Sequence, residues 1–125
     1  MAIVNAPFLW AYDVKQSGEI DKLDAGQLTS PIPEQGYRWV HIQSDLPEAA
    51  PMLRTLGLSE DITDSLIALQ TRPRVIPLNR GALIFLRGIN VNPGADPEDM
   101  VSLRLWISGS LIVTARRQDR KLMSV

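Results

Sequence analysis

The sequence predicts an α/β (α+β) domain: a mixed sheet of roughly seven strands covered by helices. Two observations lead to this fold class. Several short segments alternate between two sets of side chains, as strands do, and the helical segments are grouped between two runs of strands. At 125 residues, the chain has single-domain length and can bury roughly two-thirds of the surface that it exposes when unfolded.

The strand expected at the centre of the sheet covers residues 82–91. Both of its alternating sets are mostly apolar, which is typical of a sheet covered on both faces. Leu86 is therefore predicted to be a core residue. The following residues 92–99 are predicted to form a rigid acidic loop, because two prolines there remove backbone donors and fix φ. Strict alternation resumes from Met100 to Ile107 and predicts the next strand.

The first third of the chain is predicted to contribute two full strands and a weak one. Residues 8–14 and 37–43 alternate clearly, whereas residues 19–23 alternate weakly and are predicted to form a short, partly exposed strand. Residues 24–36 contain two prolines and two glycines and predict turns, with room for one helical turn.

Two helices are predicted between the strand runs. Asp45 and Glu48 have capping-box spacing at the start of the first helix, and Gly57 is predicted to stop it. Ser59 is predicted to cap the second helix, which we expect to continue until Pro73 ends it. The second helix carries an apolar stripe that would face the sheet: Ile62, Leu66 and Leu69.

The chain is predicted to close with a hairpin of residues 100–107 and 110–115, joined by a tight turn at Gly109. Residues 1–115 would then form one soluble α/β domain. Residues 116–125 are polar and are predicted to begin a further helix.

The composition excludes several classes of protein. The net charge of −1 creates no field that would recruit nucleic acid, and the absence of cysteine excludes disulfides and thiolate metal sites. The N-terminus lacks the features of a secretory leader, and no apolar run approaches the ~20 residues that cross a bilayer. We therefore expect this stretch of chain to be soluble.

The candidate metal ligands are the acidic loop residues Asp96, Glu98 and Asp99, with His41 as a more distant candidate. Clustered carboxylates on a rigid loop suit a hard divalent cation and are acceptable to zinc. The favoured alternative is a capped turn for the loop and a structural role for the histidine, because zinc usually needs three or four ligands. We expect no required cofactor, and zinc or another divalent cation at most weakly bound.

Arginines on or beside the strands are the other candidate site. The favoured interpretation is ion pairing with helix carboxylates such as Asp61 or Asp64, because buried arginines are rarely left unpaired; the alternative is an anion-binding site. A single histidine and no recognisable nucleophile–base set indicate that the protein is not an enzyme. The arginines concerned are Arg72, Arg74, Arg87 and Arg104.

The motif RPRV at residues 72–75 and the segment LRGINVNPGADPEDMVSLRLW at residues 86–106 closely resemble the N-terminal soluble domain of CorA-type divalent cation transporters, in the ZntB-like zinc branch. From residue 8 to residue 70 mainly the order of elements agrees. The resemblance implies α/β/α layering, with residues 116–125 beginning a long stalk helix. It also implies two membrane helices with a GxN signature beyond this sequence, which would make the chain an excised domain.

The expected function is that of the cytoplasmic domain of a zinc or divalent metal ion transporter, supporting assembly and sensing metal. The resemblance implies a homopentamer on the cytoplasmic face of the inner membrane, attached to the membrane only through the absent helices. The expected partners are a divalent cation, with zinc first, and further copies of the chain, but not nucleic acid. The alternative is a free-standing soluble module that binds metal or an anion without transport.

Overall fold

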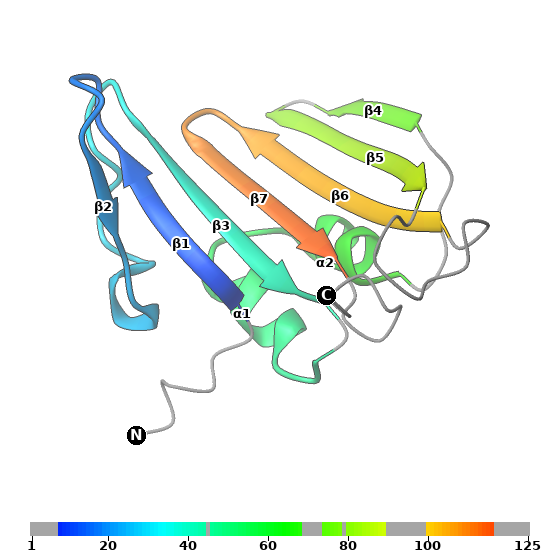
Figure 1. Ribbon diagram of the computed structural model, residues 1–125. Helices are drawn as coiled ribbons and strands as arrows, with labels where there is room; N and C mark the ends of the chain where they lie inside the picture. The colour runs from blue at the N-terminus through cyan, green and yellow to red at the C-terminus, as the bar shows by residue number, and fades with distance from the viewer. Residues whose placement is uncertain (1–7, 45, 69–73, 79, 90–99, 117–125) are drawn as a thin grey trace.

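The computed structural model describes residues 8–44, 46–68, 74–78, 80–89 and 100–116. These residues form a seven-stranded sheet and two α-helices, as Figure 1 shows. The elements are, in chain order, β1 (Phe8–Val14), β2 (Ile20–Lys22), a 3₁₀ helix (Ala25–Gln27), β3 (Tyr37–Gln43), α1 (Ala49–Thr55), α2 (Glu60–Ile67), β4 (Arg74–Leu78), β5 (Gly81–Ile89), β6 (Met100–Ser108) and β7 (Leu111–Arg116).

The sheet is mixed, with the strand order β2-β1-β3-β7-β6-β5-β4. Strands β3 and β7 pair in parallel at its centre, and the other neighbours pair antiparallel. Two parallel neighbours need a long connection between them, and here that connection carries α1, α2 and strands β4 to β6. The predicted mixed sheet of seven strands is confirmed.

Both helices lie on one face of the sheet, behind the strands in the view of Figure 1. Alternate residues of the central strands point toward these helices and form the main core with them, because a helix and a sheet must each bury one apolar side. The core comprises Ile42, Ala49, Leu53, Leu58, Leu66, Leu83, Phe85, Trp106, Val113 and Ala115.

Helix α1 begins later than the spacing of Asp45 and Glu48 predicted. Glu48 occupies the N-cap position and makes no side-chain capping bond, so the predicted capping box at Asp45 does not start this helix. Pro51 is the third helical residue, where the intrahelical ladder needs no N–H. The first such bond runs from the Met52 N–H to the Glu48 carbonyl, at 3.1 Å.

The predicted stop of α1 at Gly57 and the predicted cap of α2 at Ser59 are confirmed. Gly57 has a φ of +92°, which glycine adopts at low cost, and its N–H donates to the Arg54 carbonyl. Ser59 then caps α2 by accepting a bond from the Ile62 N–H. However, α2 ends at Ile67, earlier than predicted, because Ala68 turns to an extended ψ of 145°.

The prediction that Leu86 is a core residue is wrong. Leu83 and Phe85 face the helices and are buried, whereas Leu86 points to the opposite face and is 47% exposed. Val75 on the neighbouring strand β4 is 62% exposed. Within the described ranges, both helices cover the same face of the sheet, and the opposite face exposes apolar side chains at Leu86 and Val75.

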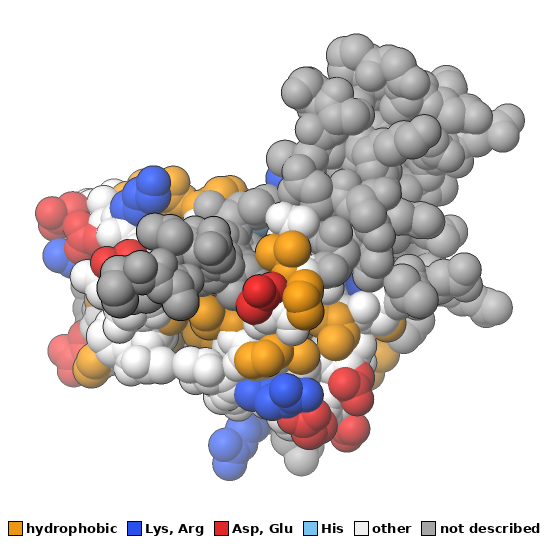
Figure 2. Space-filling view, turned by 90° about the horizontal axis from the view of Figure 1, so that it is seen from below, with side chains coloured by type: hydrophobic (Ala, Val, Ile, Leu, Met, Phe, Trp, Pro, Cys, Tyr) orange, Lys and Arg blue, Asp and Glu red, His pale blue; other side chains and the backbone are white. Residues whose placement is uncertain are grey.

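The molecular surface mixes side-chain types. In the view from below, hydrophobic side chains gather in the middle of the described surface, with most acidic and basic side chains around them, as Figure 2 shows. This side therefore carries both signs of charge around apolar patches. None of the helices in the described residues is long and apolar enough to span a bilayer.

Candidate functional site

His41 lies on β3, on the sheet face opposite the helices, within a cluster of aromatic and hydroxyl side chains. Its ring stacks on Trp10, with ring centroids 5.1 Å apart. Its Nδ1 lies 2.6 Å from the Thr114 hydroxyl oxygen, which also accepts a 3.0 Å hydrogen bond from the Trp39 indole N–H. The register places these residues side by side, because His41 pairs with Trp10 on β1 and with Thr114 on β7.

This environment keeps the imidazole neutral. His41 is only 5% exposed, and burial, together with the nearby positive charge of Arg116, lowers the pKa of His41 to about 4. The Nε2 atom is buried and has no hydrogen-bond partner among the described residues. The site thus presents an uncharged ring at neutral pH, held by its neighbours on β1 and β7.

The stability of the protein is expected to fall as the pH drops from about 6.5 toward 4. In the unfolded chain His41 gains a proton near its ordinary pKa of about 6.5, whereas in the folded chain its pKa is about 4. Acid therefore favours unfolding by up to about 3 kcal/mol. Urea unfolding at pH 7 and pH 4 would measure this loss. His41→Asn keeps a polar atom near the Nδ1 position and should lose clearly less stability over the same range; an equal loss in both proteins would contradict the assignment.

The predicted metal ligands are not brought together within the described structure. Asp96, Glu98 and Asp99 lie outside the described residues. In the parts of the chain that are described, no three His, Asp or Glu side chains gather closely enough to hold a metal ion. Whether the acidic loop binds a cation, with or without His41, stays a prediction.

Of the four arginines in the predicted site, Arg104 on β6 is the one whose side chain the structure describes. Its side chain is buried, and its Nη1 donates a 3.1 Å hydrogen bond to the Leu66 carbonyl in the last turn of α2. Among the contacts of the described residues, Arg104 therefore reaches α2 through a backbone carbonyl and not through Asp61 or Asp64, which are both exposed. This bond satisfies a carbonyl left free by the early end of the helix.

The other three arginines of the predicted site are Arg72, Arg74 and Arg87. Arg74 belongs to β4 and Arg87 belongs to β5, but their side chains lie outside what the structure describes, as does the whole of Arg72. The role of these residues as an anion or ion-pair site stays a prediction.

The sequence reasoning missed a second buried arginine, Arg38 on β3, which is 1% exposed. It forms a bidentate ion pair with Asp13 on β1, with bonds of 2.6 and 2.9 Å. The remaining guanidinium N–H groups donate to the carbonyls of Leu28, Ser30 and Pro31. Arg38 thus connects the irregular segment between β2 and β3 to strands β1 and β3 through hydrogen bonds.

A signal for this pair was present in the alternation pattern. Arg38 falls in the same alternating set as the buried Val40 and Ile42, and Asp13 falls in the same set as the buried Ala11. Strands β1 and β3 place Asp13 and Arg38 directly opposite each other. Two opposite charges at core-facing positions indicate a buried ion pair once the strand pairing is known.

Comparison with protein families gives a match over most of the chain. Residues 34–125 match the model of the family described as CorA-like Mg2+ transporter protein. Among individual proteins, 95 residues are 42% identical to the divalent cation transporter CmaX of Pseudomonas aeruginosa, covering 74% of this chain and 28% of that protein. The zinc transport protein ZntB of Yersinia enterocolitica is 38% identical over 131 residues, covering 100% of this chain and 39% of that protein.

Solved structures agree with the fold. The structure of the full-length CmaX protein superposes with a TM-score of 0.80 and 35% identity, over 89% of this chain and 35% of that chain. The ZntB cytoplasmic domain from Vibrio parahaemolyticus gives a TM-score of 0.75 at 24% identity, over 90% of this chain and 44% of that chain. The chain thus spans less than half the length of each of these matched chains.

Proposed function

Because the chain belongs to the CorA-like transporter family, we propose that it is the cytoplasmic domain of a divalent cation transporter. The match of residues 34–125 to the family model carries this proposal. The TM-score of 0.80 against full-length CmaX supports it, because 89% of this chain superposes on part of that protein. A free-standing binding module is less well supported, since the relatives named above are transporters.

Zinc is the proposed cation. The relative that covers the whole of this chain is a zinc transport protein, whereas the relative with 42% identity bears the broader description of divalent cation transporter. We propose further that the longer protein is a homopentamer, that this domain supports its assembly and senses the metal, and that it has no catalytic role.

The open face of the sheet supports the view that this domain works within a longer protein. Leu86 and Val75 are substantially exposed, and apolar sheet faces of this kind are normally buried against another layer. We propose that further helices of the longer protein cover this face, which would complete the α/β/α layering expected from the family resemblance.

A chimeric transporter tests the proposed function. This chain would replace the matching segment of Pseudomonas aeruginosa CmaX, and cation flux would be measured in proteoliposomes with zinc, magnesium, cobalt and nickel. We expect zinc flux well above that of empty liposomes, because the domain would support the same assembly. A chimera carrying Arg38→Ala should lose flux through loss of the fold.

The controls test the transporter proposal and the assignment of zinc separately. Arg54→Ala changes an exposed arginine and should leave the flux unchanged. A folded, assembled chimera that carries none of the four cations would contradict the transporter proposal. The assignment of zinc is tested in the longer protein that contains this chain, where flux of magnesium, cobalt or nickel without zinc would contradict that assignment alone.

A further inference from the structure

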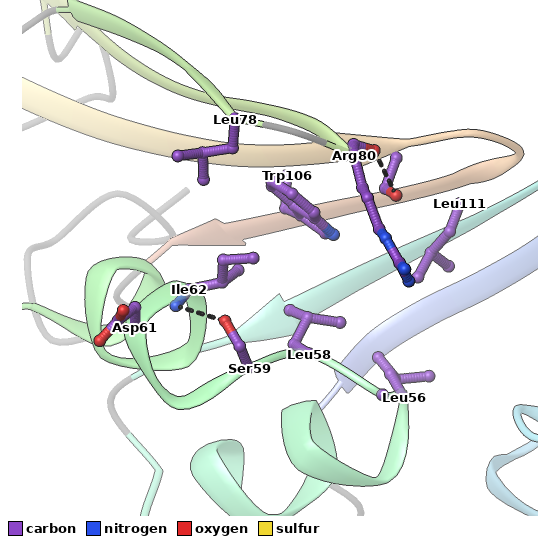
Figure 3. A pocket seen from close by; sticks show the side chains of 11 residues that line it. Leu56, Leu58, Ser59, Asp61, Ile62, Leu78, Arg80, Trp106 and Leu111 are labelled. Atoms are coloured by element: carbon purple, nitrogen blue, oxygen red, sulfur yellow. Dashed lines mark hydrogen bonds between the residues drawn. The ribbon is translucent and has the colours of Figure 1, made fainter.

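A groove on the helical side of the sheet has the size of a ligand-binding site. It lies between the loop from α1 to α2 and the two hairpin turns β4–β5 and β6–β7, as Figure 3 shows. Its volume is about 620 Å³, which falls within the range of small-molecule sites. Of the predicted metal and anion residues, His41 and Arg104 have described side chains, and neither lines the groove.

The walls of the groove are largely aliphatic, and its inner wall is an indole ring. Trp106 on β6 is buried, with 5% of its surface exposed, while Leu78 at the end of β4 is 44% exposed. Covering such surface with an apolar ligand removes it from water and is favourable. The aliphatic wall consists of Leu56, Leu58, Ile62, Leu78 and Leu111.

Two hydrogen-bond donors at one end of the groove are unused. In the described structure, the guanidinium of Arg80 and the indole N–H of Trp106 have no hydrogen-bond or ion-pair partner. Figure 3 shows the Arg80 side chain and the Trp106 nitrogen directed toward the same space, beside Leu111. Both donors are accessible from the open groove, and the guanidinium carries a positive charge, so this end of the groove favours a ligand with an anionic oxygen.

The other polar groups of the groove are already engaged or lie elsewhere. The Ser108 hydroxyl donates a 2.7 Å bond to the Arg80 carbonyl and fixes the β4–β5 turn. The Ser59 hydroxyl caps α2. Asp61 lies at the opposite end of the groove from Arg80. The groove therefore has a positively charged end at Arg80 and a negatively charged end at Asp61.

We propose that this groove binds a small amphiphilic carboxylate, with the apolar body against the leucines and Trp106 and the carboxylate at Arg80 and the Trp106 N–H. Guanidinium–carboxylate bonds are charge-assisted and among the stronger hydrogen bonds in proteins. The volume of about 620 Å³ and the pair of donors favour a small anionic molecule over an apolar peptide segment.

Decanoate is the probe, with decanol as the matched uncharged probe. Titration of the 125-residue chain below the micellar concentration is expected to give a decanoate dissociation constant tighter than about 1 mM. Arg80→Gln should weaken decanoate binding by about tenfold or more and change decanol binding by less than about twofold, because only the carboxylate uses the guanidinium. Arg54→Gln, which alters an arginine outside the groove, should change neither.

A spectroscopic readout locates the ligand. In a ¹⁵N–¹H spectrum, decanoate should shift the indole signal that is missing from Trp106→Phe, and not that of Trp39, which is bonded to Thr114. Equal decanoate affinity in the wild type and in folded Arg80→Gln would overturn the proposal. So would binding of an acidic, leucine-rich peptide in the absence of any decanoate binding, since the groove would then be a peptide site.

Discussion

Replacing Arg38 by alanine is expected to lower the free energy of unfolding by about 3–5 kcal/mol. The guanidinium is 1% exposed and is bonded to both oxygens of Asp13. Its removal leaves a buried carboxylate without a counter-charge and leaves the carbonyls of Leu28, Ser30 and Pro31 without their donor. Urea unfolding followed by circular dichroism would measure the loss.

Two further variants test the cause of this loss. Arg38→Lys should also be strongly destabilising, because one ammonium group cannot reproduce the planar fork that meets Asp13 and three carbonyls. The double variant Asp13→Ala, Arg38→Ala should lose less than the sum of the single changes, because no unpaired charge stays buried. Arg54→Ala removes an exposed pair with Glu60 and should leave the urea midpoint nearly unchanged. An Arg38→Ala protein as stable as Arg54→Ala would contradict the role assigned to the buried pair.

Phe85→Ala is expected to cost about 3–5 kcal/mol, whereas Leu86→Ala should cost less than about 1 kcal/mol in this chain. The two residues are neighbours on β5 and point to opposite faces of the sheet. Phe85 is 1% exposed and belongs to the core under the helices, so its removal leaves a cavity. Leu86 is half-exposed, so its removal leaves little space unfilled.

Chemical denaturation of both variants measures the difference, and Leu83→Ala is the matched control. Leu83 lies on the same face as Phe85 and is 4% exposed, so it should cost about 2–5 kcal/mol although it is chemically identical to Leu86. If Leu86→Ala were as costly as Leu83→Ala, the open face of the sheet would be covered in this chain.

The sequence determined the elements whose signals are local. The turn at Gly109, the cap at Ser59 and the stop at Gly57 each depend on a few neighbouring residues, and the structure confirms all three. The alternation in the segments that form β3, β5 and β6 correctly divided their described side chains into two faces. In β1 the division is correct from Trp10 onward, because the register shifts between Phe8 and Trp10. The mixed sheet and the family resemblance were also available from the sequence, because both depend on patterns along the chain.

The tertiary structure decided which of these faces is buried and what each charged residue contacts. Alternation shows that Leu83 and Leu86 lie on opposite faces, but both faces of β5 are apolar, so only the position of α1 and α2 determines that Leu83 is covered. Arg38 and Asp13 are 25 residues apart and meet because β1 pairs with β3 in one register. His41 is held neutral by burial beside Arg116, which lies far away in the sequence. Burial and pairing depend on contacts between distant segments, and the local pattern of a sequence does not contain those contacts.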